Sequence, residues 1–316
     1  MRKRVACLAY LLVFVASAFG QNGPIEIGLA VKAPFKFVAY GDTRFTDPNN
    51  HDAANAEVRQ ALVKAIADAQ PTFVSLGGDL VYNGYNRDDW NTWDTETAEW
   101  REKKIPVYPA LGNHDLHGNL QQALGNYFAR FPDLQKSRYY SVRAANTLML
   151  VLDSSEEETA GKQGEWLKQK LDSVPADVAF VFVVLHHPPY TNSSDREILR
   201  GGGHSARGSE RNLAKILESR QANMHAKVIV FAGHVHNYER HEHNGVMYFV
   251  TGGGGAHPYH ISRAKDDPLR DFDVNYHYLL VEVKTDAVKI TMNRLEMVDG
   301  KPRFTQPDTV TINLAK

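Results

Sequence analysis

The chain has 316 residues, of which 43% are hydrophobic and 23% are charged, and its formal net charge is −1. This composition is that of an ordinary globular protein and excludes a disordered or fibrous chain. The near balance of charge also argues against nucleic acid or an anionic membrane as a partner. The 14 histidines are the one unusual feature, so their positions bear most directly on function.

Residues 1–20 are predicted to be a secretory signal peptide. Basic residues at positions 2–4 precede an apolar run over residues 5–15, and small residues follow. The run is shorter than the about 20 apolar residues that span a bilayer, so we expect no integral membrane contact. The only cysteine, Cys7, lies within this segment, so the exported chain would have no disulfide and would depend on a large core. We therefore expect residues 21–316 to form a single secreted or periplasmic domain.

Five short apolar runs each stop abruptly at a polar cluster. They cover residues 35–40, 72–76, 105–111, 178–185 and 227–232. Runs this short and apolar predict strands that are buried on both faces. Between them, apolar residues at helical spacing predict helices around residues 61–69, 166–171 and 213–217. Strand, polar loop and helix repeated in this way predict an α/β fold, in which ligands bind at the carboxyl ends of the strands.

The pattern changes after about residue 243. Asn244 and Gly245, a pair typical of tight hairpin turns, precede an apolar run over residues 246–251, and two more runs cover 278–283 and 288–292. These runs predict a second, mostly antiparallel sheet that packs on the first within one domain.

The polar clusters supply nitrogen and oxygen donors for metal ions. The candidate residues are Asp42, Asp79, Asn113, His114, His186, His234 and His236. Such donors suit zinc, iron or manganese, and no sulfur ligand is among them. His234 and His236 are two residues apart, so on an extended segment their rings leave the same side and can reach two metals of a pair. Asp79 has two oxygens and could bridge that pair.

The order of these clusters resembles the motif set of the calcineurin-like metallophosphoesterases. The matching blocks are Gly41-Asp42, Gly78-Asp79, Gly112-Asn113-His114-Asp115, His186 and Gly233-His234-Val235-His236. Any one block is common, but five in this order form a strong signal. Tyr82, three residues after Asp79, and the segment 233–240 further resemble the purple acid phosphatases. The resemblance implies an α/β fold of two packed mixed sheets flanked by helices, a four-layer α/β/β/α sandwich.

Carried over residue by residue, the resemblance implies two metal ions. One would be held by Asp42, Asp79, Tyr82 and His236, and the other by Asp79, Asn113, His186 and His234. Two carboxylates and a phenolate total about −3, which favours Fe(III) in the first site, with Zn, Mn or Fe(II) in the second. A metal-bound hydroxide would attack phosphorus in line, and His114 would protonate the leaving oxygen or bind the phosphoryl group.

Two further residues are candidates for substrate binding. Arg44 stands where superfamily members outside the purple branch usually have a histidine, and arginine cannot ligate a metal. It would contact phosphate as a bidentate donor or form an ion pair with a nearby carboxylate, and the sequence leaves both interpretations open. His204 follows a glycine loop, where the purple acid phosphatases place substrate-binding histidines. His187 is expected to be structural, because it directly follows His186.

The function expected is hydrolysis of small phosphate monoesters by an exported, acid phosphatase-like enzyme. Phosphodiester hydrolysis at the same metal pair is the alternative. The two activities use the same metal pair and differ in the residues that line the substrate pocket. A protein of another class, which binds metal without catalysis, is the third hypothesis. The complete ligand set and His114 count against it.

Overall fold

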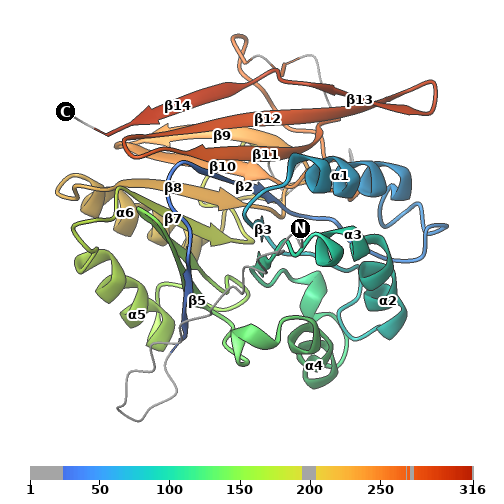
Figure 1. Cartoon of the computed structure of the whole chain (residues 1–316), viewed down its shortest axis with the longest axis horizontal. Helices are drawn as coiled ribbons and strands as arrows, with labels where there is room; N and C mark the ends of the chain where they lie inside the picture. The colour runs from blue at the N-terminus through green and yellow to red at the C-terminus, as the bar shows by residue number, and fades with distance from the viewer. Residues whose placement is uncertain (1–23, 194–203, 268, 271–273, 315–316) are drawn as a thin grey trace, which may run out of the picture.

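The computed structural model describes residues 24–193, 204–267, 269–270 and 274–314, and the predicted signal peptide lies outside them. Two seven-stranded sheets form its centre (Figure 1). Sheet A runs in the order β1 (Glu26–Leu29), β5 (Tyr140–Ala144), β6 (Thr147–Val151), β7 (Phe180–Leu185), β8 (Lys227–Ala232), β10 (Val246–Thr251) and β9 (Tyr238–His243). Sheet B runs in the order β13 (Lys301–Thr305), β12 (Ala287–Val298), β11 (Tyr276–Val283), β2 (Phe35–Tyr40), β3 (Val74–Leu76) and β4 (Val107–Pro109), and β14 (Thr309–Asn313) also pairs with β12.

All five predicted strands form, as β2, β3, β4, β7 and β8, but their division between sheets differs from the prediction. The C-terminal strands do not make a sheet of their own. β11 pairs antiparallel with β2, placing Leu279 opposite Ala39, whereas β10 extends sheet A parallel to β8. These partners are far apart in the chain, and local periodicity identifies a strand without identifying its neighbour.

The inner faces of the two sheets pack on each other through aromatic side chains. Phe37 of β2 contacts Phe182 of β7 edge to face, with ring centroids 5.0 Å apart, and stacks on Phe73 at 4.7 Å. Phe231 of β8 joins the same cluster, and all four rings are buried. Each such pair contributes about 0.5–1.5 kcal/mol beyond its buried area.

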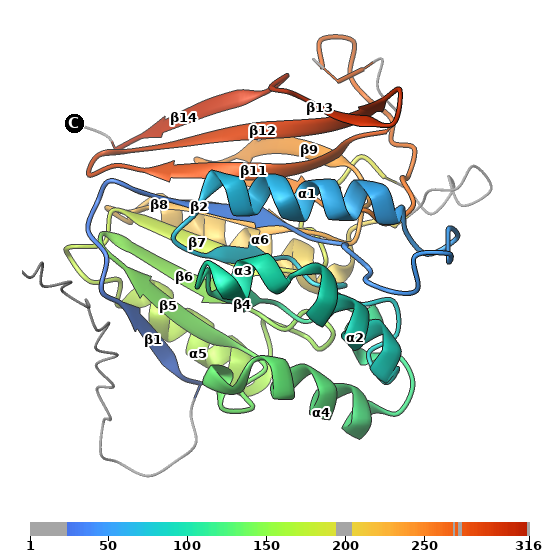
Figure 2. The ribbon, with the colours of Figure 1, turned by 45° about the vertical axis from the view of Figure 1, so that its right-hand side comes forward.

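Helices cover the outer faces and complete the four predicted layers (Figure 2). α5 (Gly161–Asp172) and α6 (Gly208–Gln221) place Trp166, Leu167 and Leu213 in a second apolar cluster on the outer face of sheet A. α1 (Ala56–Ala69) packs on β11 and β12. Three further helices follow α1 in the chain: α2 (Arg87–Glu96), α3 (Ala98–Glu102) and α4 (Leu120–Arg130).

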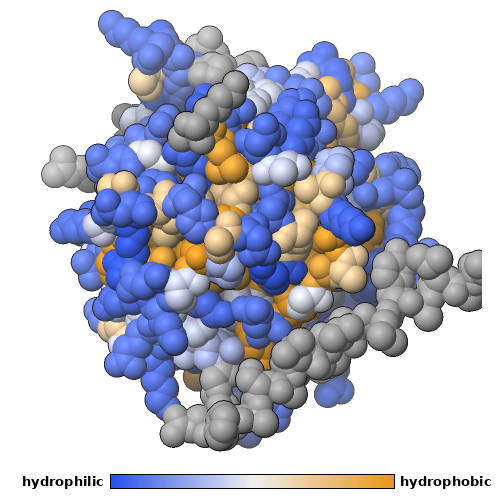
Figure 3. Space-filling model, turned by 60° about the vertical axis from the view of Figure 1, so that its left-hand side comes forward, coloured by the Kyte–Doolittle hydropathy of each residue, from blue (hydrophilic) through white to orange (hydrophobic). Residues whose placement is uncertain are grey.

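The surface is mixed in character. On the face drawn in Figure 3, hydrophobic residues gather near the middle and hydrophilic residues surround them. Of the helices in the described part of the chain, none is long and apolar enough to cross a membrane.

Candidate metal centre

The loops that follow β2, β3, β7 and β8 meet where the two sheets join. Asp42 N–H donates to Gly78 O at 3.0 Å, and Gly233 N–H donates to His186 O at 3.0 Å. The loop after β10 holds the end of β2, because Ala256 N–H donates to Asp42 O at 2.9 Å. These backbone bonds fix the polar clusters against one another.

Four residues of these loops have left-handed backbone conformations that non-glycine residues rarely adopt. Their φ angles are 59° for Asp42, 44° for Arg44, 51° for Asp79 and 68° for His234. Such conformations cost about 1–3 kcal/mol each and persist where the surrounding structure imposes them, often at functional sites. Gly78 has a φ of 88°, and a Cβ there would lie 2.7 Å from His186 Nδ1. The glycine before Asp79 therefore permits the close approach of two predicted ligands.

Asp42, Asp79 and His236 form the first group of candidate ligands, with ligand atoms all within 4.8 Å of one another. His236 Nδ1 donates to His257 O at 2.6 Å, which leaves a lone pair on Nε2 when the ring is neutral. That Nε2 lies 3.5 Å from Asp42 Oδ1, and both atoms are buried without a hydrogen-bond partner among the described residues. Two buried acceptors that face each other in this way fit a bound cation.

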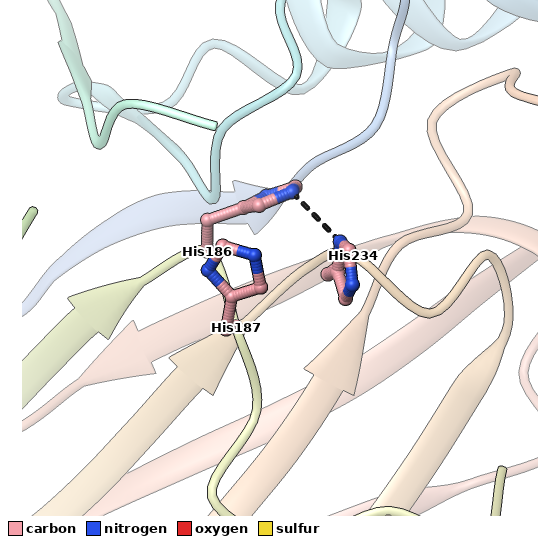
Figure 4. A group of neighbouring side chains, drawn as sticks. All are labelled: His186, His187 and His234. Atoms are coloured by element: carbon pink, nitrogen blue, oxygen red, sulfur yellow. Dashed lines mark hydrogen bonds between the residues drawn. The ribbon is translucent and has the colours of Figure 1, made fainter. Parts of the chain in front are cut away.

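The second group surrounds His186 Nε2. His186 Nδ1 donates to Gly77 O at 2.8 Å, so Nε2 of the neutral ring is an acceptor. It faces Asn113 Oδ1 at 3.0 Å and Asp79 Oδ1 at 3.3 Å. It also faces His234 Nδ1 at 3.2 Å (Figure 4). His234 can donate one hydrogen bond to it, but the amide oxygen and the ionised carboxylate cannot. These residues therefore also fit a cation, and Asp79 belongs to both groups.

His187 also lies in the second group, with His186 and His234. Ser154 Oγ accepts hydrogen bonds from the backbone N–H groups of His186 and His187, at 3.2 and 3.0 Å, and lies 2.9 Å from His187 Nδ1. Because both oxygen lone pairs are used, the hydroxyl donates to Nδ1. The neutral ring then carries its proton on Nε2, which makes it a donor instead of a metal ligand. Burial lowers the pKa of His187 to about 2, so the ring stays neutral.

Arg44 forms the ion pair that was one of its two predicted roles. Its Nε and Nη2 donate to Asp79 Oδ2 at 3.3 and 3.1 Å, while Asp79 Oδ1 accepts from the His114 backbone N–H at 2.8 Å. Burial alone would raise the pKa of Asp79, but His186, Arg44 and His114 hold it below the usual range. Burial and the charge of Asp79 raise the pKa of Asp42. A bound cation would favour the ionised form of both carboxylates.

His114 lies beside both groups, and its Nδ1 donates to Tyr82 O at 2.7 Å. Burial lowers the pKa of His114 to about 4. The Tyr82 ring stacks on His114, with centroids 5.3 Å apart, and is half-buried. In the part of the chain that the structure describes, the Tyr82 hydroxyl makes no hydrogen bond to Asp42, Asp79 or His236. The structure thus places the Tyr82 ring against His114 and shows no direct bond from its hydroxyl to these three predicted ligands among the described residues.

His204 is brought to the site from the segment before α6. Its ring centroid lies 4.2 Å from that of His234, and its Nε2 lies 3.4 Å from the hydroxyl of Tyr259. Tyr259 was not predicted from the sequence, since it belongs to no motif and is placed by the loop between β10 and β11.

Asp115 has a structural role that the sequence analysis did not assign. Its Oδ1 accepts from the N–H groups of Leu80 and Val81 at 2.9 and 3.2 Å, and its Oδ2 accepts from Gly112 N–H at 2.9 Å. It thereby ties the loop of Asp79 to the loop of Asn113. Burial and the nearby Asp79 raise its pKa to about 8. The sequence feature that could have identified Asp115 is its place in the Gly-Asn-His-Asp block.

Comparisons with known proteins identify the family to which the chain belongs. A model of the calcineurin-like phosphoesterase family matches residues 35–238, more than half of the chain. Purple acid phosphatase 1 of Ipomoea batatas is 27% identical over 227 residues, which cover 66% of this chain and 43% of that protein. Fe(3+)-Zn(2+) purple acid phosphatase 12 of Arabidopsis thaliana is 24% identical over 237 residues, which cover 70% of this chain and 46% of that protein.

A solved structure of a purple acid phosphatase from yellow lupin (Lupinus luteus) seeds is similar in fold, with a TM-score of 0.64 and 18% identity. The match covers 89% of this chain and 54% of that one. The chain thus spans about half the length of each of these three proteins. The family match runs from the start of β2 to the start of β9 and includes every predicted metal ligand. By sequence and fold, the chain belongs to the calcineurin-like phosphoesterase family.

Proposed function

We propose that this chain is a dinuclear-metal phosphoesterase that hydrolyses small phosphate monoesters. The observation that supports a metal pair is the convergence of buried acceptors: His236 Nε2 faces Asp42 Oδ1, and His186 Nε2 faces Asn113 Oδ1 and Asp79 Oδ1. Buried acceptors that face one another with no donor between them cost free energy of folding. Two bound cations would remove that cost by coordinating the acceptors.

In this proposal Asp42, Asp79, Tyr82 and His236 hold the first ion, and Asp79, Asn113, His186 and His234 hold the second. Bound metal ions lower the pKa of water and offset the charge that develops on a transferring phosphoryl group. Fe(III) in the first site and Zn, Mn or Fe(II) in the second is supported by one relative named as an Fe(3+)-Zn(2+) phosphatase.

The proposed role of His114 is to protonate the leaving oxygen. Because Nδ1 is held by Tyr82 O, the exchangeable proton sits on Nε2. Arg44 and His204 are proposed to bind the phosphoryl group.

Export is part of the same proposal. The pattern of residues 1–20 is that of a signal peptide, so the mature single domain would begin near Gln21. N-terminal sequencing of the protein from its native host tests this, and retention of Met1 would refute it.

The proposed activity is tested with purified, metal-analysed protein. We expect turnover of p-nitrophenyl phosphate to exceed that of bis(p-nitrophenyl) phosphate, and Asp79→Asn to abolish turnover while lowering the bound metal. His225→Ala, an exposed histidine away from the site, is the matched control and should behave as wild type. Preference for the diester would reassign the substrate class, and metal binding without turnover of either ester would indicate a non-catalytic protein. Full activity of Asp79→Asn would contradict the site.

A further inference from the structure

Tyr259 is held firmly against the segment that carries His236. Its backbone N–H donates to His236 O at 3.1 Å, and its carbonyl accepts from Asn237 Nδ2 at 2.7 Å. Its ring stacks on the His236 imidazole, with centroids 4.0 Å apart and ring planes 19° apart. The backbone and the ring together fix where the hydroxyl points.

The Tyr259 hydroxyl lies near both residues that the sequence predicts to bind substrate. It lies 3.4 Å from His204 Nε2. Burial raises the pKa of Tyr259, and Arg44 is near enough for its charge to oppose that shift. Arg44 and His204 come from widely separated segments, and both lie near Tyr259. All three side chains are only partly buried, so a small molecule can reach them.

The groups around this hydroxyl are suited to an anion. A guanidinium has five N–H donors and no acceptor, and Arg44 uses only Nε and Nη2 on Asp79. A phenol and an imidazole are also hydrogen-bond donors. The metal ligands differ from this set, because there acceptors converge and fit a cation. A metal ion at the Tyr259 hydroxyl would also be repelled by Arg44.

We propose that Tyr259 is a substrate-binding residue that donates a hydrogen bond to the phosphoryl group. Arg44 and His204 would be the other hydrogen-bond donors on the same side of the site. This inference rests on the proposed function and adds a residue to its site. When a phosphate ester binds, the Tyr259 O–H and the free N–H groups of Arg44 turn to its oxygens.

The test uses inorganic phosphate as the probe on metal-loaded, full-length protein. Calorimetric titration should show that Tyr259→Phe raises the Kd for phosphate about tenfold, the size expected for one lost hydrogen bond to a charged group. KM for p-nitrophenyl phosphate should rise similarly, while metal content and the visible spectrum stay as in wild type. Tyr190→Phe is the matched control, because the Tyr190 hydroxyl bonds Glu218 and not the site.

A second measurement needs no variant and is independent of folding. In wild-type protein, phosphate should protect Tyr259 but not Tyr190 from nitration by tetranitromethane, as read by peptide mass spectrometry. Unchanged phosphate affinity in Tyr259→Phe, absence of protection, or loss of metal from the variant would each overturn the inference. A wild-type protein that holds two metals but neither binds phosphate nor hydrolyses an ester would instead overturn the proposed function.

Discussion

Three histidines of the site make the same kind of hydrogen bond. In each, a backbone carbonyl accepts a hydrogen bond from Nδ1, so that Nε2 faces the site. His186 donates to Gly77 O, His236 to His257 O and His114 to Tyr82 O. Burial also lowers the pKa of each ring. For His186 and His236, a neutral imidazole with this fixed tautomer can ligate a metal without first losing a proton.

This arrangement predicts which histidine serves which ion. His236→Ala should leave one bound metal per chain by retaining the second site, because its Nε2 faces only the Asp42 side of the centre. His187→Ala should retain both metals, because its Nε2 carries a proton. Elemental analysis of both variants checks this. Loss of metal from His187→Ala to the level of His236→Ala would contradict the tautomer assigned to His187.

We expect Glu158, which lies outside the site, to make the stability of the protein depend on pH. It is fully buried, and neither carboxylate oxygen has a hydrogen-bond partner among the described residues. Burial raises its pKa to about 7 from a usual value of 4.5. The stability contributed by the neutral carboxyl is thus complete below about pH 4.5 and is lost as the pH rises through 7, a cost of about 3 kcal/mol at most.

Glu158→Gln removes this titration. The difference in Tm between Glu158→Gln and wild type should depend on pH. It should favour the variant by about 5 °C more at pH 8 than at pH 5. The exposed neighbour Glu157→Gln should show no such difference. A Tm difference between Glu158→Gln and wild type that is equal at both pH values would refute the prediction.

At the scale of elements, the strands could be predicted from local periodicity but their pairing could not. The run over residues 227–232 matches β8, whereas nothing local indicates that β11 lies beside β2. The positions of Trp90, Trp93 and Trp100 fit one face of a single helix. All three are buried, but α2 ends before Thr97 and α3 carries Trp100.

The same limit applies to the site. Its predicted members follow strands in recognisable blocks, so their convergence could be anticipated from the α/β pattern. Tyr259 lies in an irregular segment, and its place beside His236 depends on backbone hydrogen bonds between distant parts of the chain. No pattern in the sequence carries that information.

Arg59 of α1 links three elements near the site. Its guanidinium donates to Glu96 of α2 at 2.8 and 2.6 Å and to Thr46 O at 3.2 Å, and its side chain is 1% exposed. Arg59→Met would leave Glu96 buried without its partner, so the free energy of unfolding should fall by about 3–5 kcal/mol.

Denaturant titration of Arg59→Met checks this value. Lys64→Met is the control, because Lys64 on the same helix pairs with Asp68 in an exposed ion pair. It should change stability by less than about 1 kcal/mol. Equal effects of the two substitutions would show that the buried pair does not stabilise the junction of α1 and α2.

For the whole molecule, the centre depends on the docking of the two sheets. Asp42, Asp79 and Asn113 follow strands of sheet B, whereas His186 and His234 follow strands of sheet A. Neither sheet holds the complete proposed ligand set. The proposed function therefore couples metal binding to the packed state, and chelation with EDTA should lower the Tm in a way that added metal reverses.

The number of metal ions bound per chain in fully active protein tests the central claim most directly. The account predicts two transition-metal ions per chain, with iron as one of them and a visible absorption band that Tyr82→Phe removes. A colourless, iron-free but active protein with two ions would remove only the assignment of Fe(III) and Tyr82. Full activity with fewer than two ions per chain would contradict the dinuclear centre itself.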